Sequence, residues 1–202
     1  ADGANPVFRC WRAHALLLIG SPTDAVQEAR QAVRLGPRLH QAQLALACAA
    51  AEARQFHEAQ RAFERAVELS GRDPHLLVEY AGFMAFERGP APAEAAAMEA
   101  LAVRPESANA WAALGMAQFR QRRLSESESS LHRCLELDPH HARGQVAMTM
   151  LLNATGRHRQ AMALASLMED DPRTRGYAET ARREAFRASF GAVDRQRYDV
   201  TL

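Results

Sequence analysis

The stretch that decides the fold is residues 109–139, which read NAWAALGMAQFRQRRLSESESSLHRCLELDP. Its two halves each have the spacing of apolar residues that is typical of an amphipathic helix, and the polar residues 121–123 separate them. Asp138 and Pro139 close the second half, and proline ends a helix because it lacks the backbone N–H and clashes with the preceding turn. The stretch therefore predicts two short helices joined by a tight turn.

The same arrangement recurs along the chain. Prolines that precede helix-like segments lie at positions 37, 74, 105, 139 and 172, and their spacings of 37, 31, 34 and 33 residues average close to 34. A period of this length is typical of repeat proteins, in which neighbouring units stack to bury a continuous core. We therefore expect a repeat array over residues 1–173. Its repeats are expected at about 7–37, 38–74, 75–105, 106–139 and 140–172.

Each expected repeat is broken in its middle and has a small residue soon after the break. The breaks lie at residues 20–22, 54–55, 88–90, 121–123 and 155–157. The small residues recur at equivalent positions of the second helix, at Ala25, Ala59, Ala93, Ser127 and Ala161. A small side chain at this position lets the two helices of a pair approach closely. The second repeat departs from the period, because residues 70–73 form a short insertion before Pro74.

These features resemble the tetratricopeptide repeat, whose pattern is W-x2-L-G-x2-Y followed by A-x3-F, A and P. Residues 106–139 carry the pattern at Trp111, Leu114, Gly115, Ser127, Leu131, Cys134 and Pro139. No single repeat matches every position, and residues 140–172 lack the signature of the first helix. The resemblance covers about residues 10–172 and implies an all-α, right-handed α-solenoid of about five helix-turn-helix repeats.

The residues after the array are expected to protect its last apolar face. Residues 174–191 fit a C-terminal capping helix, with Tyr177, Ala181, Ala185 and Phe186 on one stripe and an Arg/Glu-rich opposite face. Residues 192–202 are polar with a mild apolar alternation, and we expect a C-terminal tail there.

Charge and composition exclude several classes of partner. The formal net charge is +1, all 25 basic residues are Arg, and no stretch approaches the ~20 apolar residues that span a bilayer. We therefore expect neither nucleic-acid binding nor membrane insertion by this chain, and the absence of Lys indicates a GC-rich, bacterial coding sequence. Three widely spaced Cys favour free thiols and a cytoplasmic location. The chain begins at Ala1 rather than Met, which leaves a periplasmic location or an upstream membrane tether as the alternative.

No pattern of catalytic or metal-ligating residues stands out. The sequence has no phosphate-binding loop, no zinc-protease motif and no C-x-x-C pair, so we expect no enzyme, no cofactor, no catalytic residue and no metal site. Asp138, His140 and His141 are candidate metal ligands by residue type, but a turn between repeats is favoured because adjacent backbone positions rarely converge on one ion. Cys134 is expected to be a buried, inert thiol rather than a nucleophile, since it occupies a small-residue position of the repeat.

The resemblance implies a binding surface on the first helices of successive repeats, which line a concave groove in this family. The expected groove residues are Leu44, Phe83, Phe86, Asn109, Met116, Phe119, Arg120, Arg143, Met150 and Asn153. The Phe and Met side chains form an apolar line suited to a helix or a hydrophobic peptide, and the Arg and Asn side chains suit its backbone or a carboxylate. The alternative is that these side chains pack against adjacent repeats, or that the tail or a neighbouring molecule fills the groove.

We therefore expect a non-catalytic protein–protein interaction scaffold that binds a peptide or helix of a partner in the concave groove. One alternative is the repeat region of a larger enzyme or signalling protein. Another is an envelope assembly factor whose anchor lies outside the chain. Self-association through end-to-end stacking or docking of the tail is a further possibility.

Overall fold

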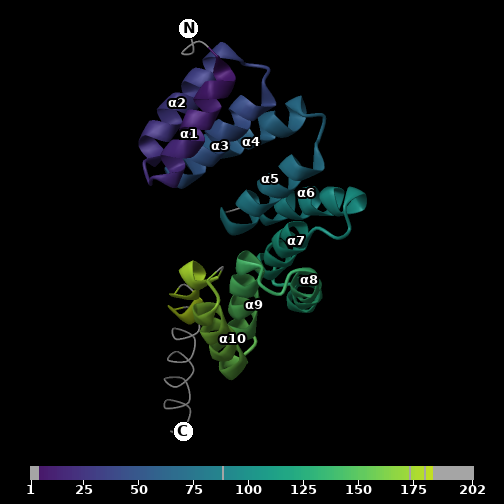
Figure 1. Ribbon diagram of the computed structural model, residues 1–202. Helices are drawn as coiled ribbons and strands as arrows, with labels where there is room; N and C mark the ends of the chain where they lie inside the picture. Colours follow the sequence, from purple (N-terminus) through teal and green to yellow (C-terminus); the bar gives the residue numbers. More distant parts are fainter. Residues whose placement is uncertain (1–4, 88, 173, 180, 184–202) are drawn as a thin grey trace, which may run out of the picture.

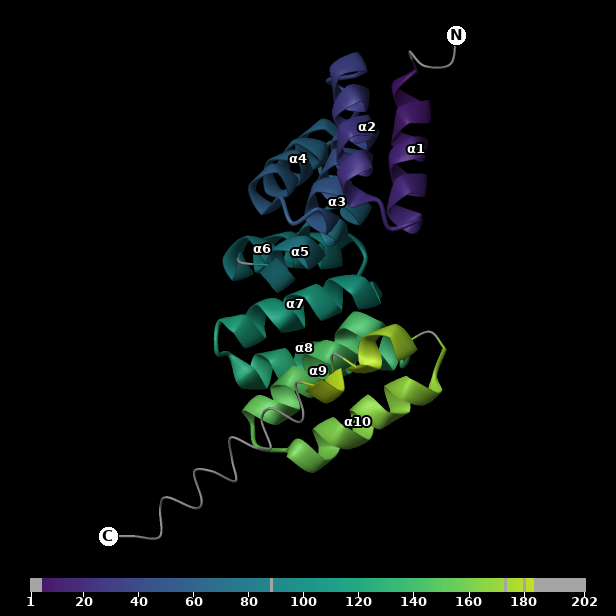
Figure 2. The same ribbon diagram turned by 90° about the vertical axis from the view of Figure 1, so that its left-hand side faces the viewer.

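The computed structural model describes residues 5–87, 89–172, 174–179 and 181–183, and this part of the chain contains ten labelled helices and no strand. The helices are α1 (Pro6–Leu18), α2 (Pro22–Leu35), α3 (His40–Glu52), α4 (Phe56–Leu69), α5 (Pro74–Glu87), α6 (Pro90–Val103), α7 (Ala108–Arg120), α8 (Leu124–Leu137), α9 (Ala142–Ala154) and α10 (His158–Asp170). Consecutive helices form pairs that stack in chain order, from α1 and α2 at one end to α9 and α10 at the other (Figures 1 and 2). The predicted all-α solenoid of helix-turn-helix units is confirmed.

The turn inside a pair repeats with the same backbone geometry. Gly20, Arg54, Arg122 and Gly156 all have positive φ, between 61° and 78°, and each lies at the break between the two helices of its pair. The amide that follows each of them donates to the carbonyl five residues before it, at 2.8–3.0 Å, which closes the first helix. Arg54 and Arg122 adopt the left-handed conformation, which glycine adopts more easily. The hydrogen bond that closes the helix therefore outweighs the backbone preference of arginine at these two turns.

Close packing within a pair rests on the small residues. The side chains at the recurring small position are completely buried, at Ala25, Ala59, Ala93, Ser127 and Ala161. In the fourth pair, the Ser127 hydroxyl donates to the Gly115 carbonyl at 2.7 Å. A Cβ at Gly115 would lie 2.6 Å from the Cγ of Leu131, so α7 and α8 are in contact with no room for another carbon atom.

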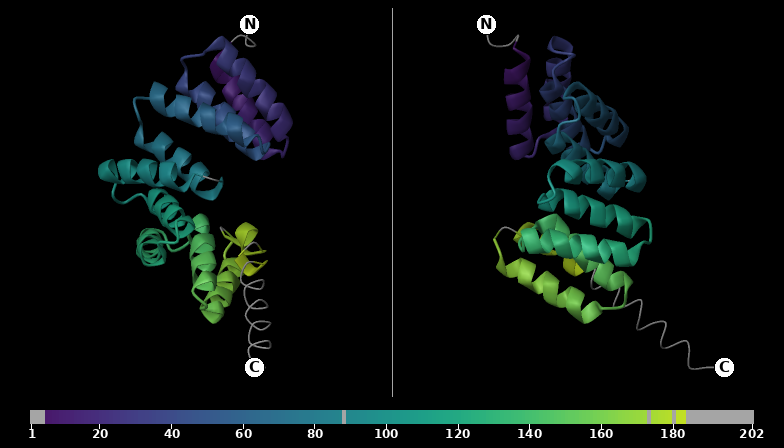
Figure 3. Two further views of the ribbon diagram at one scale, coloured as in Figure 1. Left: turned by 180° about the vertical axis from the view of Figure 1, so that it is seen from behind. Right: turned by 90° about the vertical axis from the view of Figure 1, so that its right-hand side faces the viewer.

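The stack is interrupted between the second and third pairs. α5 packs on α7 and α1 packs on α3, but the backbones of α3 and α5 do not approach closely, and α4 supplies the closest backbone contact between the second and third pairs. The apolar core is divided at the same place, into one cluster on α1–α4 and a second that extends from Val67 to α10. The ring of Phe63 joins the two clusters, because its centroid lies 5.1 Å from Phe83 and 6.3 Å from Tyr80. The direction of the stack changes here (Figures 1 and 3).

The connection at residues 70–73 differs in path from the others, but it is not an insertion. It has four residues, as do the connections at 36–39, 104–107 and 138–141, and successive first helices begin 34 residues apart, so the predicted insertion was wrong. Gly71 and Arg72 both have positive φ, which no residue of the other three connections has, so the chain takes a different path from α4 to α5. Arg72 then reaches α6, where its guanidinium pairs with Glu99 at 2.5 Å. α4 keeps the contact with α5 that joins each second helix to the following pair, whereas the close contact between successive first helices is lost between α3 and α5.

The end of the array is covered by a further helical segment. Residues 175–179 and 181–183 are helical, and Ala178 and Ala181 are buried against Ala165 and Met168 of α10. Tyr177 is 46% exposed, so the prediction that it belongs to the buried stripe was wrong, and Ala178 takes its place. The rest of the predicted capping helix to residue 191 and the predicted tail at 192–202 lie outside the described residues.

Candidate functional site

The first helices of the third, fourth and fifth pairs, α5, α7 and α9, bring some of the predicted groove residues together on one side of the array. Glu79 of α5, Asn109 of α7 and Arg143 of α9 line a single small pocket of about 10 Å³. The Arg143 side chain reaches α5, and its Nη1 lies 3.2 Å from the position that a Cβ on Gly82 would occupy. Ala112 of α7 lines the same pocket as Arg143, and its small side chain leaves room for the Arg143 side chain. Arg143 therefore fills this part of the face and leaves little room for a ligand beside it.

The expected apolar line is not a continuous open surface. Met116 is 2% exposed and belongs to the core, so it cannot line a groove in this conformation. Phe86 and Phe119 are partly buried and pack against the same core, and Arg120 donates from Nη1 to the Phe86 carbonyl at 2.7 Å. The physical reason is that α7 packs on both α5 and α9, so positions facing the groove also become contacts between pairs.

On α9, the two expected groove residues differ in their surroundings. Met150 is partly buried and contacts both the main core and the small cluster of α10 and the helical segment after it. The Asn153 Nδ2 is buried and has no hydrogen-bond partner among the described residues, while its Oδ1 lies 3.4 Å from the Nδ1 of His158. Asn153 therefore has an unsatisfied donor that is closed to solvent in this conformation.

The open apolar surface lies where the second and third pairs diverge. Leu44 of α3 and Phe83 of α5 are partly exposed and contact both core clusters. Beside Phe83, a cleft of about 900 Å³ opens between α4, the end of α5 and the start of α6. Its apolar lining is made by Phe56, Phe83, Met84, Pro90, Ala91 and Pro92. The sequence predicted only Phe83 among these, although the unusual connection at 70–73, with Gly71 and Arg72, was a signal that the adjacent pairs separate.

The rim of this cleft is cationic. Arg54 and Arg61 line it and have no ion-pair partner among the described side chains, and the Arg54 guanidinium lies 5.1 Å from the centroid of the Phe56 ring. Glu58, the acidic residue of the lining, is neutralised by Arg30, whose Nη2 lies 2.7 Å from its Oε2. The hydrogen bond from Arg30 holds the pKa of Glu58 below its usual value. The cleft thus combines an apolar floor with two cations that are free to bind a carboxylate.

The two histidines at the boundary between the fourth and fifth pairs face different partners and do not form a metal site. His141 caps α9, because its Nδ1 accepts from the Gly144 amide at 3.0 Å, and its Nε2 lies 2.8 Å from the Asn109 Oδ1. His140 pairs instead with Asp171. Among the described residues, no group of three His, Cys, Asp or Glu residues could hold a metal ion. The cap by His141, which was predicted only as part of an exposed turn, is a structural role that sequence reasoning missed.

His141 predicts a pH dependence of stability. Burial lowers the pKa of His141 from its ordinary value of 6.5, so the unfolded chain binds this proton first as the pH falls. The neutral ring stabilises the fold fully above pH 6.5, and this contribution is lost as the pH falls through the lower folded pKa. Urea unfolding at about pH 7.5 and about pH 5.5 should show a smaller acid-induced loss of stability for His141→Asn, whose side chain caps without titrating, than for the wild type.

The control for this measurement is His57→Asn, since His57 is exposed near the start of α4 and caps no helix. It should leave the pH dependence as in the wild type. An equal pH dependence in the wild type and in His141→Asn would contradict the role assigned to the cap.

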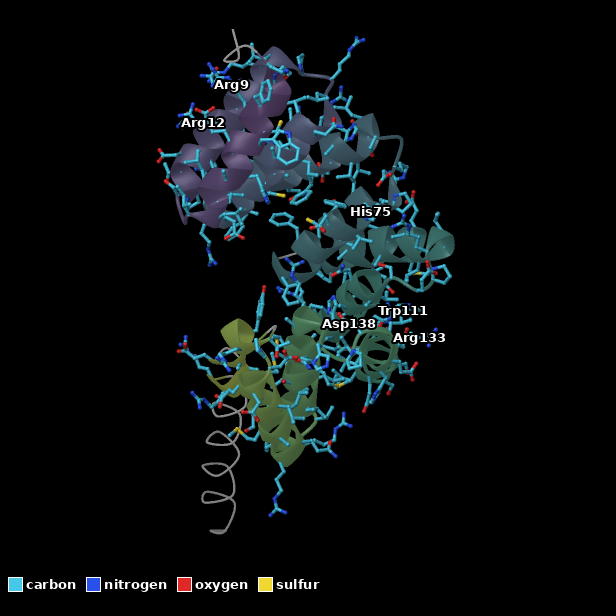
Figure 4. The ribbon with its side chains drawn as sticks, in the orientation of Figure 1. Arg9, Arg12, His75, Trp111, Arg133 and Asp138 are labelled. Carbon is cyan, nitrogen blue, oxygen red and sulfur yellow. The ribbon has the colours of Figure 1, made fainter. Side chains whose placement is uncertain are left out.

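The remaining candidate nucleophile, Cys134, lies in the core rather than at a surface site. Cys134 is completely buried, and burial with the nearby charge of Asp138 raises the pKa of its thiol to about 12. Figure 4 labels Asp138 at the end of α8 and Trp111 on α7, whose indole N–H donates to the Pro105 carbonyl at 2.8 Å. No described helix is long and apolar enough to cross a membrane.

Comparisons with known proteins agree with the fold. The family model for the tetratricopeptide repeat matches residues 40–73 and 108–141, and no curated protein matches the sequence. Among solved structures, TTC0263, a thermophilic TPR protein from Thermus thermophilus, superposes with a TM-score of 0.74 at 17% identity, covering 92% of this chain and 99% of that chain. PilW, a type IV pilus biogenesis factor, superposes with a TM-score of 0.72 at 16% identity, and the match covers 96% of this chain and 94% of PilW. YrrB, described as a TPR protein with an unusual peptide-binding site, superposes with a TM-score of 0.59 at 16% identity. The match covers 90% of this chain and 94% of YrrB.

The arrangement of stacked helix pairs defines the molecule as an α-solenoid repeat protein. The family model identifies two tetratricopeptide repeats in this chain, at residues 40–73 and 108–141, which agrees with the repeat that the sequence predicted.

Proposed function

We propose that this chain is a non-catalytic scaffold that binds a peptide or helix of a partner protein in the concave groove, and that the bound segment continues past Phe83 into the adjacent cleft between α4, α5 and α6. The observation that carries the proposal is the cleft of about 900 Å³ beside Phe83. It lies within the range of volumes that bind ligands, and it is already open in the free chain. Binding there requires little rearrangement of the scaffold, so the entropy cost falls mainly on the partner.

The lining defines the chemistry of the partner segment. Phe56, Phe83 and Met84 favour apolar side chains, each of which gains roughly 1.5–3 kcal/mol when fully buried. Arg54 and Arg61 favour an acidic residue next to the apolar ones. The partner segment is therefore an apolar peptide or amphipathic helix with a flanking Asp or Glu.

The other predicted groove residues lie outside the cleft. Leu44 provides partly exposed apolar surface on α3, and Asn109 and Arg143 line a separate small pocket on α7 and α9, where a partner could contact their outer polar atoms. The unsatisfied Nδ2 of Asn153 is buried and would have to become exposed to bind a partner. The use of this fold in YrrB, described by its peptide-binding site, and in PilW, described as a pilus biogenesis factor, supports a role in protein interaction.

The proposal is tested by selecting peptides from a random displayed library on the immobilised chain. The selected peptides are expected to be apolar with a flanking acidic residue. Fluorescence polarisation should then show that Phe83→Ala weakens the best peptide at least about tenfold, or roughly 1.4 kcal/mol. Because Phe83 also contacts Phe63 in the core, circular dichroism is needed to confirm the fold of this variant.

A second variant avoids the core. Arg61→Glu changes an exposed residue of the rim, so it should leave stability unchanged and weaken an acidic peptide several-fold. The matched control is Leu167→Glu, which places the same charge at an exposed position of α10 away from the cleft. Peptides that bind Phe83→Ala and Arg61→Glu as tightly as the wild type would exclude the cleft as the site.

A further inference from the structure

The first helix exposes a large apolar face. Trp11 is 70% exposed and Leu18 is 76% exposed, and several neighbours on α1 are also open to solvent. At 100° per residue, the apolar side chains fall within an arc of about 120° on one side of the helix. We call this set the α1 stripe, and it consists of Val7, Phe8, Trp11, Ala15, Leu18 and Ile19.

The α1 stripe faces away from the rest of the molecule. The opposite side of α1 carries Ala13, Leu16 and Leu17, which pack against α2 and α3. α1 lies at the edge of the stack, and no described element covers its outer side in the edge views of Figures 2 and 3. The flanking Arg9 and Arg12 (Figure 4) are directed to Glu28 of α2, at 2.9 Å and 3.6 Å, so the stripe itself carries no charge.

Several equivalent positions in later pairs belong to buried stacking surfaces. One repeat after Phe8 and Ala15 lie Ala42 and Ala49 of α3, and both are completely buried. In α7, Ala110 and Ala117 lie at the positions of Phe8 and Ala15, and Ala113 lies at the position of Trp11. All three are buried as well. In these pairs the preceding helix pair covers the position. Phe8, Trp11 and Ala15 therefore have the register of a stacking surface, and Phe8 and Trp11 are large apolar side chains where α3 and α7 carry alanine. Val7 and Leu18 correspond to the exposed Gln41 and Glu52 of α3, so they widen the stripe beyond that register.

The order of side chains in the stripe favours a second copy of the chain as the occupant. When two α1 helices pack antiparallel about a twofold axis at residue 13, Val7 lies opposite Ile19 of the other copy and Phe8 lies opposite Leu18. The same register places Trp11, the largest side chain, opposite Ala15, the smallest. Every member of the stripe meets another member, which is the self-complementarity that a twofold interface requires. We propose that the chain forms a dimer through antiparallel packing of the α1 stripe on that of a second copy.

The dimer is expected to be reversible. Each α1 is 13 residues long, and the corresponding helix is only about 20 Å in length, so the contact is small compared with that of an obligate dimer. Sedimentation equilibrium of the full chain between about 1 µM and about 500 µM should therefore show a monomer–dimer equilibrium. A wild-type chain that remains monomeric throughout this range overturns the proposal.

The decisive variant is Trp11→Glu, which places a charge at the centre of the stripe without disturbing the core. It should raise the dimer dissociation constant at least about thirtyfold and leave helicity and the thermal midpoint unchanged. Leu167→Glu is the matched control, because Leu167 is 65% exposed on α10, and it should not change the dissociation constant. A dimer that survives Trp11→Glu would show that another surface is used.

The register is tested by charge rescue. Ala15→Arg should also weaken the dimer when it is the only change. An equimolar mixture of Trp11→Glu and Ala15→Arg should associate again, because the introduced carboxylate at position 11 faces the introduced guanidinium at position 15, and the second contact keeps its native Trp11 and Ala15. Association of the mixture supports the antiparallel register, and a mixture that stays monomeric overturns it.

Discussion

Leu131→Ala is expected to lower the free energy of unfolding by about 3 kcal/mol, within the range of about 2–5 kcal/mol for buried leucines. Leu131 is completely buried in α8, and its side chain fills the space over Gly115 of α7. Truncation leaves a cavity between two helices that cannot close further, because their backbones are already in contact. Urea unfolding followed by circular dichroism measures the loss.

Two comparisons make this measurement specific. Leu167→Ala removes the same atoms from a side chain that is 65% exposed and should change stability by less than about 0.5 kcal/mol. Gly115→Val should be severely destabilising in the wild type, where even a Cβ would be 2.6 Å from Leu131, and much less so in Leu131→Ala. A loss below about 1 kcal/mol for Leu131→Ala, or additive effects of the two changes, would contradict the packing described for α7 and α8.

Cys134 in the folded chain is expected to react with thiol reagents at least about a thousandfold more slowly than in the unfolded chain. Its pKa is raised from 9.0 to about 12, so the thiolate at neutral pH is scarcer by a factor on the order of a thousand. Burial adds a steric barrier, since the Sγ lies 2.7 Å from the position of a Cβ on Gly144 of α9. Reaction with Ellman's reagent measures the rate.

The experiment needs Cys10→Ser and Cys48→Ser in the same chain, so that one thiol remains. Labelling of this variant in urea gives the unfolded reference rate. Rapid stoichiometric labelling under native conditions would instead support a reactive nucleophile at Cys134, the alternative that its sequence position already made unattractive.

The local structure could be predicted well from the sequence. Proline and glycine positions predicted where helices begin and end, and the recurring small residues predicted close pairs, since Ala59 and Ser127 are completely buried as expected. These features depend on the backbone preferences of a few residues and on a period that several repeats share. Tyr177 is an exception, because it was predicted to be buried and is exposed. Helical spacing predicts a stripe of apolar residues, but it does not specify which side of the stripe packs against α10.

The candidate site could be predicted only in part. Phe83 was identified, but Met116 was assigned to the groove although it lies in the core, because the sequence does not specify how tightly the helix pairs curve. The cleft beside Phe83 depends on how α4, α5 and α6 diverge, which the sequence does not specify. Trp11 was not identified, since a helix with an apolar outer face has the same sequence pattern as one that is buried on both sides.

The interruption between α3 and α5 also affects how the array unfolds. In a solenoid, cooperativity passes from each unit to its neighbours through their interfaces, and the weakest interface sets where the array separates into independent blocks. Here the residues before and after the interruption have separate cores, and the rings of Phe63, Tyr80 and Phe83 connect them. A segment bound in the cleft beside Phe83 would contact both blocks and supply the missing interface. Ligand binding would then be linked thermodynamically to the cooperativity of the entire array, since a ligand that requires both blocks to be folded stabilises them together.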